Sequence, residues 1–353
     1  MMSAAPREAS MSLNQVALIT GVTGQDGSYL SEFLLGMGYE VHGLRRRNSS
    51  FNTHRIDHLI NTNNKFYLHD GDMTDTSGLF ALLNKVSPSE IYNLAAQSHV
   101  GASFDTPEYT ANVDALGTLR ILEALRQNPV LRLTKFYQAS TSELFGNSPA
   151  PQNEASLFAP RSPYAVAKLY AHWITVNYRE SYGLHASCGI LFNHESSRRG
   201  PTFVSKKIID GIIRHKSDSS YQVLLGNLNS KRDWGHAREY AEAMWRVLQL
   251  DSPVDLVLGT GNSMTVRDFA SLACEHVGIT ITWTGDGFNE VGTTNTGQIL
   301  FKVNKEYFRP SEVNFLEADA RKARELIDWK PTIEIGDLIA EMFKDSEKES
   351  LQP

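Results

Sequence analysis

The chain has little cysteine: Cys188 and Cys274 are the only two among its 353 residues. Two cysteines so far apart in the sequence cannot build a disulfide framework or a CxxC metal pattern. Both are therefore expected to be buried, apolar side chains in a reducing compartment. No metal site is predicted.

Long apolar runs and a surplus of basic residues are also missing. No stretch approaches the ~20 apolar residues of a membrane-spanning helix, and residues 1–12 lack the apolar core of a signal peptide. Lysine and arginine number 34 against 40 acidic residues, giving a net charge of -6, whereas nucleic-acid-binding domains are basic. These absences predict a soluble, cytoplasmic protein with no membrane or nucleic-acid partner.

What the sequence does contain is a regular alternation of strand-like and helix-like segments. Short apolar runs of strand character alternate with stretches whose apolar residues recur at helical spacing. This rhythm predicts an α/β fold, a doubly wound parallel Rossmann-type sheet with a smaller mixed α/β lobe, whose ligands bind beyond the carboxyl ends of the strands. The expected strands are 16–19, 40–44, 65–69, 90–94, 134–139, 185–191 and 255–259, and the expected helices after the first are 75–86, 107–127, 164–182 and 236–250.

A glycine-rich turn, residues 21–27 (GVTGQDG), lies between the first expected strand and the first expected helix. Glycines at this place allow a tight turn and let the backbone approach a pyrophosphate, which the helix N-terminus attracts. Glycines also simply make turns. Their position between this strand and this helix favours a dinucleotide site.

The second expected strand ends in a basic loop, residues 45–50 (RRRNSS). Folds that prefer NAD place an acidic residue here, whereas arginine accommodates the 2′-phosphate of NADP. The alternatives are a solvated basic loop or a nuclear-import or nucleic-acid patch. The position of the loop favours NADP. Asp72-Met73 and the segment 94–98 follow the third and fourth strands and extend the expected cofactor bed.

Tyr164 and Lys168 are four residues apart and therefore lie on one face of an expected helix. An ammonium near a phenol stabilises the phenolate, so that tyrosine can act as a base below its free pKa of ~10. An ordinary half-exposed helix face would give the same spacing. Thr141 and Glu143 strengthen the catalytic interpretation, because two residues two apart on an extended segment point the same way at the same sheet edge.

These motifs together resemble the extended short-chain dehydrogenases, and among them the GDP-mannose 4,6-dehydratase family. Further similar motifs are 161–164 (RSPY), 192–196 (FNHES), 198–200 (RRG), 225–228 (LGNL), 231–235 (KRDWG) and 307–313 (YFRPSEV), and the resemblance spans about residues 16–342. This chain departs from the family pattern at Asn48, Phe145 and Ser197, and in a connection at 283–301 that is shorter than usual.

The resemblance implies a role for each matching position. The catalytic groups would be Thr141, Glu143, Tyr164 and Lys168. The NADP-binding residues would be Gly21, Thr23, Gly24, Gln25, Asp26, Arg46, Arg47, Asn48, Ser49, Asp72, Met73, Leu94, Ala95, Ala96, Gln97, Ser98, Tyr109, Lys168, His194 and Arg199. The residues facing a GDP-sugar would be Asn193, Lys207, Arg232, Arg309 and Glu312.

The resemblance also implies an activity and an organisation. A lyase of this family would convert GDP-mannose to GDP-4-keto-6-deoxy-mannose and water through bound NADP, the first step toward GDP-deoxysugars such as GDP-fucose, and it would be a homodimer or homotetramer. The expected domains are a flexible tail (1–12), an NADP-binding Rossmann domain (13–192, completed by 235–262), a substrate-binding lobe (193–234 and 263–345) and a second tail (346–353).

Three rival functions use the same fold. A sugar-nucleotide 4-epimerase needs Tyr164 and Lys168 but no glutamate after the threonine, so Glu143 favours dehydration. A 4-keto-sugar reductase would consume NADPH stoichiometrically. A nonenzymatic NADP-sensing or scaffold protein would not need Thr141, Glu143, Tyr164 and Lys168 together.

Overall fold

The computed structural model describes residues 15–49 and 51–350. The expected tail at 1–12, Ser50 of the basic loop and the last three residues lie outside the described part. No described helix is long and apolar enough to cross a membrane, and the described residues contain no cluster of three or more histidine, cysteine, aspartate or glutamate side chains that could hold a metal ion. Cys188 and Cys274 are both buried, as expected, and neither is in a disulfide.

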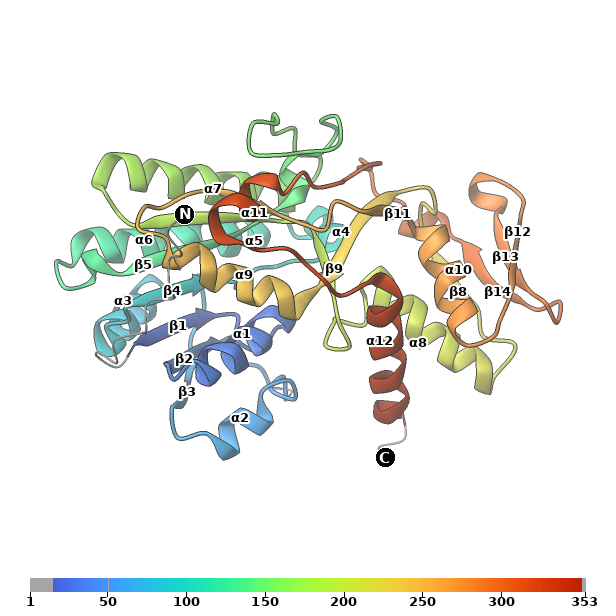
Figure 1. Cartoon of the computed structure of the whole chain (residues 1–353), viewed down its shortest axis with the longest axis horizontal. Coiled ribbons are helices and arrows are strands. Elements are labelled where there is room, and N and C mark those ends of the chain that lie inside the picture. Colours follow the sequence, from blue (N-terminus) through green and yellow to red (C-terminus); the bar gives the residue numbers. More distant parts are fainter. Residues whose placement is uncertain (1–14, 50, 351–353) are drawn as a thin grey trace, which may run out of the picture.

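A seven-stranded parallel sheet forms the larger half of the described molecule (Figure 1). Its order is β10-β6-β5-β4-β1-β2-β3, so the direction of strand succession reverses at β1, where ligands of such sheets bind. The predicted strands are confirmed to within two residues at each end. They are β1 Val16–Thr20, β2 Glu40–Arg45, β3 Phe66–Asp70, β4 Glu90–Asn93, β5 Lys135–Thr141, β6 Ala186–Leu191 and β10 Leu256–Leu258.

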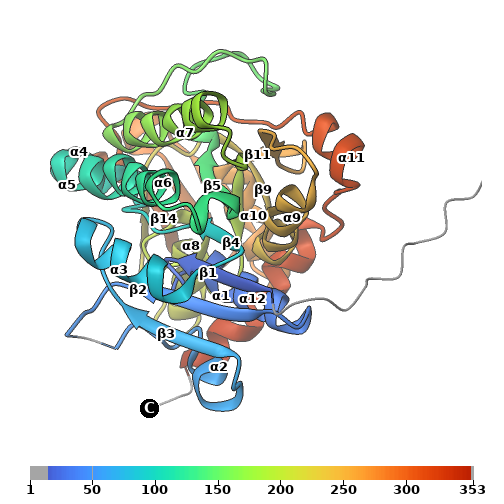
Figure 2. The same ribbon diagram turned by 90° about the vertical axis from the view of Figure 1, so that its left-hand side faces the viewer.

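Helices cover both faces of this sheet (Figure 2). One core cluster packs α1 (Gln25–Gly36) and α9 (Ala237–Gln249) on one face. A second cluster packs α3 (Thr76–Val86), α6 (Gly117–Gln127) and α7 (Pro163–Tyr182) on the other. Strands covered on both sides must be apolar throughout, which is why short apolar runs predict them well. Smaller helices are α2 (Asp57–Thr62), α4 (Val100–Asp105) and α11 (Arg321–Ile327).

The expected continuous helix at 107–127 is wrong in detail. Its residues form α5 (Pro107–Thr110), a π-helix η1 (Ala111–Leu116) and α6. A π-turn admits one extra residue per turn, so side chains before and after it do not keep α-helical spacing, and apolar periodicity alone does not reveal the change.

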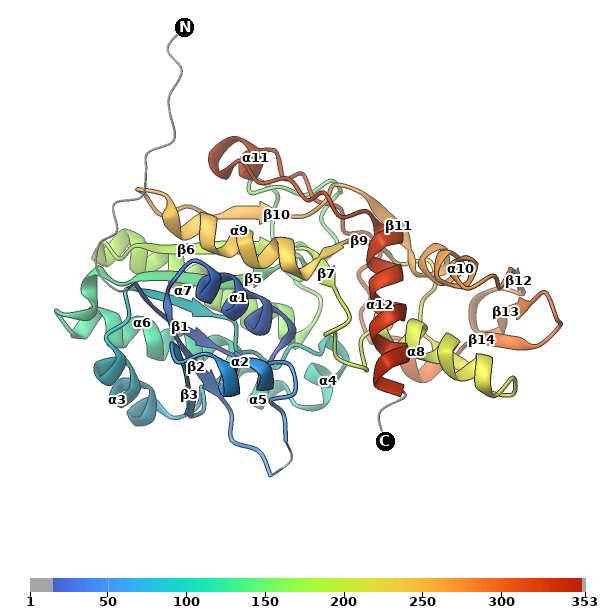
Figure 3. The same ribbon diagram turned by 60° about the horizontal axis from the view of Figure 1, so that its bottom comes forward.

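A smaller lobe lies at one end of the sheet (Figure 3). It contains a sheet of order β12-β13-β14-β8 and a three-stranded sheet β11-β9-β7 beside it. Its apolar core joins α8, α10 and α12 to the four-stranded sheet. The bounds are β7 Asn193–Glu195, α8 Val204–Ser217, β8 Val223–Leu225, β9 Lys231–His236, β11 Ser263–Thr265, α10 Val266–His276, β12 Ile281–Thr284, β13 Val291–Thr294, β14 Ile299–Val303 and α12 Ile335–Ser350.

The expected tail at 346–353 is wrong for its first five residues, which continue α12 to Ser350. Ser346 is buried, and its Oγ accepts a hydrogen bond of 2.6 Å from Lys206 Nζ on α8. The contact with α8 therefore holds this part of α12 in place, although the sequence there is polar.

Candidate active site

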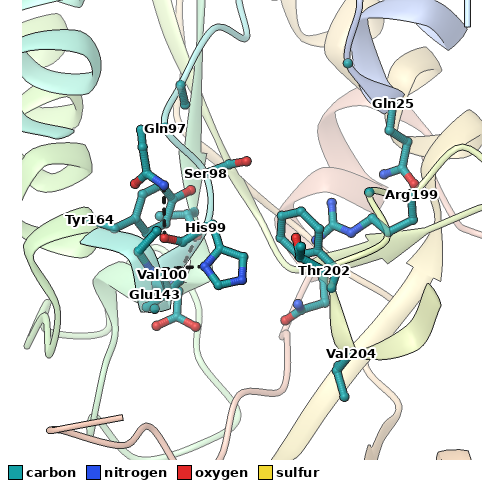
Figure 4. A pocket seen from close by; sticks show the side chains of 18 of the residues that line it. Gln25, Gln97, Ser98, His99, Val100, Glu143, Tyr164, Arg199, Thr202 and Val204 are labelled. Atoms are coloured by element: carbon teal, nitrogen blue, oxygen red, sulfur yellow. Dashed lines mark hydrogen bonds between the residues drawn. The ribbon is translucent and has the colours of Figure 1, made fainter. Parts of the chain in front are cut away.

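One large cavity lies between the carboxyl edge of the parallel sheet and the smaller lobe. Its volume is about 1120 Å³, which exceeds a usual single-ligand pocket and suits two ligands side by side. Figure 4 shows Glu143, Tyr164 and His99 on one wall and Arg199 and Thr202 on the facing wall.

The glycine-rich turn lines the cavity at the carboxyl end of β1. Gly21 has a φ of +69°, and a Cβ there would lie 2.8 Å from the Cα of Ala95. A Cβ on Gly27 would lie 2.6 Å from the Gly21 carbonyl oxygen. Only glycine fits both places, and the N-terminus of α1 is thereby brought to the cavity. This backbone cradle fits the pyrophosphate of a dinucleotide.

Gln25 and Asp26 were predicted to bind the cofactor, yet their side chains link α1 to β7 and the residues after it. Gln25 Nε2 donates to the carbonyl oxygen of His194 at 3.0 Å and Gln25 Oε1 accepts from Ser196 Oγ at 2.8 Å. Asp26 Oδ2 lies 3.0 Å from His194 Nε2. Both residues line the cavity, but their polar atoms are engaged with the protein.

The Asp26–His194 contact is a partly buried charged pair. Burial raises the pKa of Asp26, but the charge and the hydrogen bond of His194 outweigh it and bring that pKa to about 2. Burial lowers the pKa of His194, while Asp26 raises it, and the net shift is upward. His194 also stacks on Tyr240, with ring centroids 4.5 Å apart.

Asp26→Asn is therefore expected to lower the free energy of unfolding by about 3 kcal/mol near pH 6. The raised pKa of His194 means that its contribution is present below its unfolded pKa of 6.5 and is lost as the pH rises through the folded value. The loss should accordingly shrink near pH 9. Urea unfolding at both pH values measures this loss of stability. Asp70→Asn is the control, because Asp70 pairs with Arg45 at the surface, where an ion pair contributes little to stability. Equal losses at the two pH values would contradict a charged pair.

The basic loop after β2 reaches the cavity through Arg46. Arg46 Nη1 donates to the Tyr109 hydroxyl, and its guanidinium lies 6.0 Å from the centre of that ring. Both residues line the cavity, whereas Arg47, Asn48 and Ser49 are not among the lining residues. Arg55, which the sequence interpretation omitted, lines the cavity and donates to the Arg198 carbonyl oxygen at 2.7 Å.

The remaining part of the predicted cofactor bed lies where expected. Asp72, Met73 and the five residues of the segment 94–98 all line the cavity. Asp72 Oδ1 accepts from Thr74 N and Thr74 Oγ1, at 2.9 and 2.8 Å, so this carboxylate shapes a turn. The segment 94–98 is held from below by Thr20 Oγ1, which accepts from the backbone of Leu94 and Ala95 at 3.0 Å each.

Thr141 and Glu143 both reach the cavity, but not by the predicted geometry. The chain turns at Ser142–Leu144, a short 3-10 helix, and Thr141 Oγ1 caps it by accepting from Glu143 N at 3.2 Å. The alternation rule of an extended strand therefore does not apply. Glu143 is brought to the cavity by the turn, and its Oε1 lies 3.4 Å from Arg309 Nη1.

Tyr164 and Lys168 lie on the first turns of α7, as predicted. Ser162 Oγ caps this helix by accepting from Ala165 N at 3.1 Å, and Pro163 occupies the first helical position. The expected lowering of the Tyr164 pKa is wrong for this structure. Burial raises it, the charges of Asp114 and Glu143 add to the rise, and a hydrogen bond with Thr141 and the charge of Arg199 lower it. Lys168 Nζ donates to the carbonyl oxygen of Ala139 at 2.9 Å.

The five predicted sugar-nucleotide residues, Asn193, Lys207, Arg232, Arg309 and Glu312, all line the lobe side of the cavity. Arg232 is buried, and its burial lowers its pKa although Glu143 and Glu312 lie nearby. Lys207 Nζ lies 3.4 Å from the centre of the Tyr307 ring. Glu312 Oε1 accepts from Arg309 N at 2.8 Å, which fixes the loop that carries both.

Arg199, predicted to bind NADP, contacts two other side chains of the protein, Glu195 and Phe203. Its Nε lies 2.9 Å from Glu195 Oε2, and its guanidinium lies 3.8 Å from the centre of the Phe203 ring. Several further cavity residues were not assigned from the sequence, among them His99 and Tyr307. His99 directly follows the predicted cofactor-binding segment 94–98 and could have been found by that position, whereas Tyr307 lies in the motif 307–313 and gave no separate signal.

The chain matches the sequence profile described as GDP-mannose 4,6 dehydratase over residues 18–342. It is 53% identical over 342 residues to a GDP-mannose 4,6-dehydratase of Yersinia enterocolitica, covering 92% of each chain. It is 52% identical over 334 residues to the GDP-mannose 4,6 dehydratase of Homo sapiens, covering 93% of this chain and 90% of that one.

Solved structures share the fold. A UDP-glucuronic acid 4-epimerase of Bacillus cereus, in complex with UDP-glucuronic acid and NAD, superposes with a TM-score of 0.80 at 21% identity, covering 95% of this chain and all of that one. A dTDP-glucose 4,6-dehydratase of Bacillus anthracis, in complex with NAD, gives 0.78 at 19% identity, covering 95% and 97%. The predicted Rossmann-type fold is thereby confirmed.

Proposed function

The chain belongs to the GDP-mannose 4,6-dehydratase family, and on that premise we propose that it is a lyase that converts GDP-mannose to GDP-4-keto-6-deoxy-mannose and water. This reaction is the first step toward GDP-deoxysugars such as GDP-fucose. The observation that carries the proposal is the meeting of Thr141, Glu143, Tyr164 and Lys168 in the wall of one cavity with the α1 N-terminus. Incubation with GDP-mannose should give a 4-keto product, seen as a chromophore in alkali, and an absence of that product would sink the proposal.

We propose the following roles for the chain's own groups in the oxidation step. Bound NADP would supply a reversible hydride acceptor. Tyr164 takes the proton of the sugar's 4-hydroxyl group, and Thr141 donates a hydrogen bond to the oxygen at C4. Lys168, one turn further along α7, supplies a positive charge that favours the phenolate.

Glu143 is proposed to carry out the elimination of water. A ketone at C4 makes the C5 proton acidic, and the Glu143 carboxylate removes that proton. The same group, now protonated, gives its proton to the departing 6-hydroxyl, which leaves as water. The hydride removed from C4 would then return to C6, and C5 would take up a proton that has exchanged with solvent, which completes the 4-keto-6-deoxy product. Burial of Glu143 beside Arg309 supports this role, because a positioned carboxylate can serve first as base and then as acid.

The lobe, residues 193–234 and 263–345, is proposed to hold the sugar nucleotide, while residues 13–192 with 235–262 hold the cofactor. The guanidinium groups of Arg232 and Arg309 suit a diphosphate, since their planar forks match its oxygens. Lys207 adds a third positive charge at the same wall. Asn193 and Glu312 would face the sugar and the nucleotide.

NADP is proposed over NAD because the strand β2 ends in arginine and Arg46 lies at the cavity wall. Arg46→Ala should weaken NADP binding by about 10- to 100-fold, the equivalent of one charge-assisted contact of about 1.5–3 kcal/mol. Its affinity for NAD should stay within about twofold. Arg47→Ala is the matched comparison, with a smaller expected loss because Arg47 does not line the cavity. Equal losses for NAD and NADP in Arg46→Ala, measured by calorimetry, would contradict a 2′-phosphate contact.

A homodimer or homotetramer is also proposed. Val166, Tyr170 and Trp173 form an apolar stripe on α7 and are 56, 40 and 55% exposed. A second copy of the chain could cover this stripe.

A cytoplasmic location is proposed as well. Two buried cysteines that form no disulfide are in keeping with a reducing compartment.

A further inference from the structure

Asp114 is a buried carboxylate that the proposed mechanism does not use. It lies on the π-helix η1 and is 1% exposed. π-Turns are rare and often occur at functional sites. Here the turn packs against α7, the helix that carries Tyr164 and Lys168. The Thr118 hydroxyl donates to the Asp114 carbonyl oxygen at 3.0 Å and fixes the backbone at this point.

One oxygen of this carboxylate has a partner and the other does not. Oδ1 accepts from the backbone N–H of Gln97 at 2.7 Å. Oδ2 is buried and has no hydrogen-bond partner among the described residues. A buried carboxylate with one oxygen unpartnered is costly, so a compensating positive charge nearby is expected.

Lys168 on α7 supplies a positive charge that acts on Asp114, although no ion pair joins the two side chains within the described residues. Lys168 is 3% exposed, and its Nζ donates to the Ala139 carbonyl oxygen. Burial lowers the pKa of Lys168, and the negative charge of Asp114 is the largest influence that raises it, followed by that of Asp26. Burial in turn raises the pKa of Asp114 to about 6, while Lys168 and the Gln97 N–H lower it.

The negative charge of Asp114 also acts on Tyr164. After burial, Asp114 is the largest influence that raises the Tyr164 pKa, and Glu143 on the adjoining turn also raises it. Thr141 and Arg199 act in the opposite direction. Asp114 therefore favours the protonated form of both members of the pair on α7.

We propose that Asp114 is a positioning residue for the Tyr164–Lys168 pair, because its buried and partly unpartnered carboxylate lies on the π-helix that packs against α7. Only the expected effect of Asp114 on turnover rests on the proposed function. The coupling between Asp114 and Lys168 is a property of the ligand-free protein and can be measured there.

Asp114→Asn should shift both limbs of the pH profile of kcat toward lower pH by about one unit, because a neutral amide no longer favours the protonated forms of Tyr164 and Lys168. The amide oxygen still accepts the bond from Gln97 N. Thr118→Val is the matched control on the neighbouring turn, which changes no charge and should lower Tm without moving either limb. The inference would be overturned if an active Asp114→Asn enzyme kept both limbs of its kcat pH profile in place. It would also be overturned if Thr118→Val shifted the two limbs by the same amount as Asp114→Asn.

A second measurement needs neither turnover nor a folded Asp114 variant. Carbon NMR of the side-chain carboxyls of ligand-free protein should show a group that titrates near pH 6, the value to which burial raises the pKa of Asp114. The midpoint of this titration should rise in Lys168→Met. It should stay in place in the control Lys135→Met, because the ammonium of Lys135 donates to the Leu248 carbonyl oxygen. An unchanged midpoint in Lys168→Met would refute the coupling. Failure to form a 4-keto product would sink the proposed function and leave this titration untouched.

Discussion

Glu143→Gln should lower kcat by about 10²- to 10⁴-fold while NADP and GDP-mannose affinities stay within about twofold, because general acid–base groups contribute on that scale. Glutamine has nearly the same shape, and its oxygen can still accept from Arg309 Nη1, which lies 3.4 Å from Glu143 Oε1. What it cannot do is remove the C5 proton or return one to the departing 6-hydroxyl. Steady-state kinetics and calorimetry measure the two quantities separately.

Glu306→Gln is the matched control for that substitution. Glu306 is another carboxylate of the cavity wall, exposed on the turn Lys305–Tyr307, and its loss should leave turnover near that of the unchanged protein. If Glu143→Gln kept full turnover, or if Glu306→Gln lost as much, Glu143 would not be the eliminating group.

Tyr164→Phe should also lower kcat by about 10²- to 10⁴-fold, but it should stop the reaction earlier. The hydroxyl at C4 cannot lose its proton, so even a single turnover should show no near-ultraviolet signal of reduced nicotinamide. Glu143→Gln, by contrast, should still show that signal, because oxidation at C4 precedes elimination.

The control for Tyr164→Phe lies on the same helix. Tyr170 is 40% exposed on α7, and Tyr170→Phe should leave both the signal and the turnover unchanged. A transient nicotinamide signal in Tyr164→Phe as strong as in Glu143→Gln would assign the C4 proton to another group.

The sheet and the general place of the site were predictable from the sequence. Strands covered by helices on both faces are apolar throughout, so runs such as Val16–Ile19 identify them. Since the carboxyl ends of parallel strands share one edge, the motifs that follow β1, β4 and β5 had to meet there. Tyr164 and Lys168 needed only the spacing of a helix.

The details that escaped prediction depend on long-range partners or local irregularities. The contacts of Gln25 and Asp26 with His194 could not be predicted, because His194 is 168 or more residues away in the sequence. Glu143 reaches the cavity through a 3-10 turn that period-two alternation cannot describe. The importance of Asp114 depends on a π-turn and on burial beneath α7, and neither leaves a periodic signal.

In the proposed reaction, one sugar is oxidised at C4, dehydrated across C5 and C6 and reduced again within the same site. The most direct test is to convert GDP-mannose in heavy water with catalytic NADP and examine the product by NMR. The expected product is a 4-keto-6-deoxy sugar that carries deuterium at C5, with no net consumption of NADPH. A product without deuterium at C5, a 4-epimer, or stoichiometric loss of NADPH would contradict the proposed reaction.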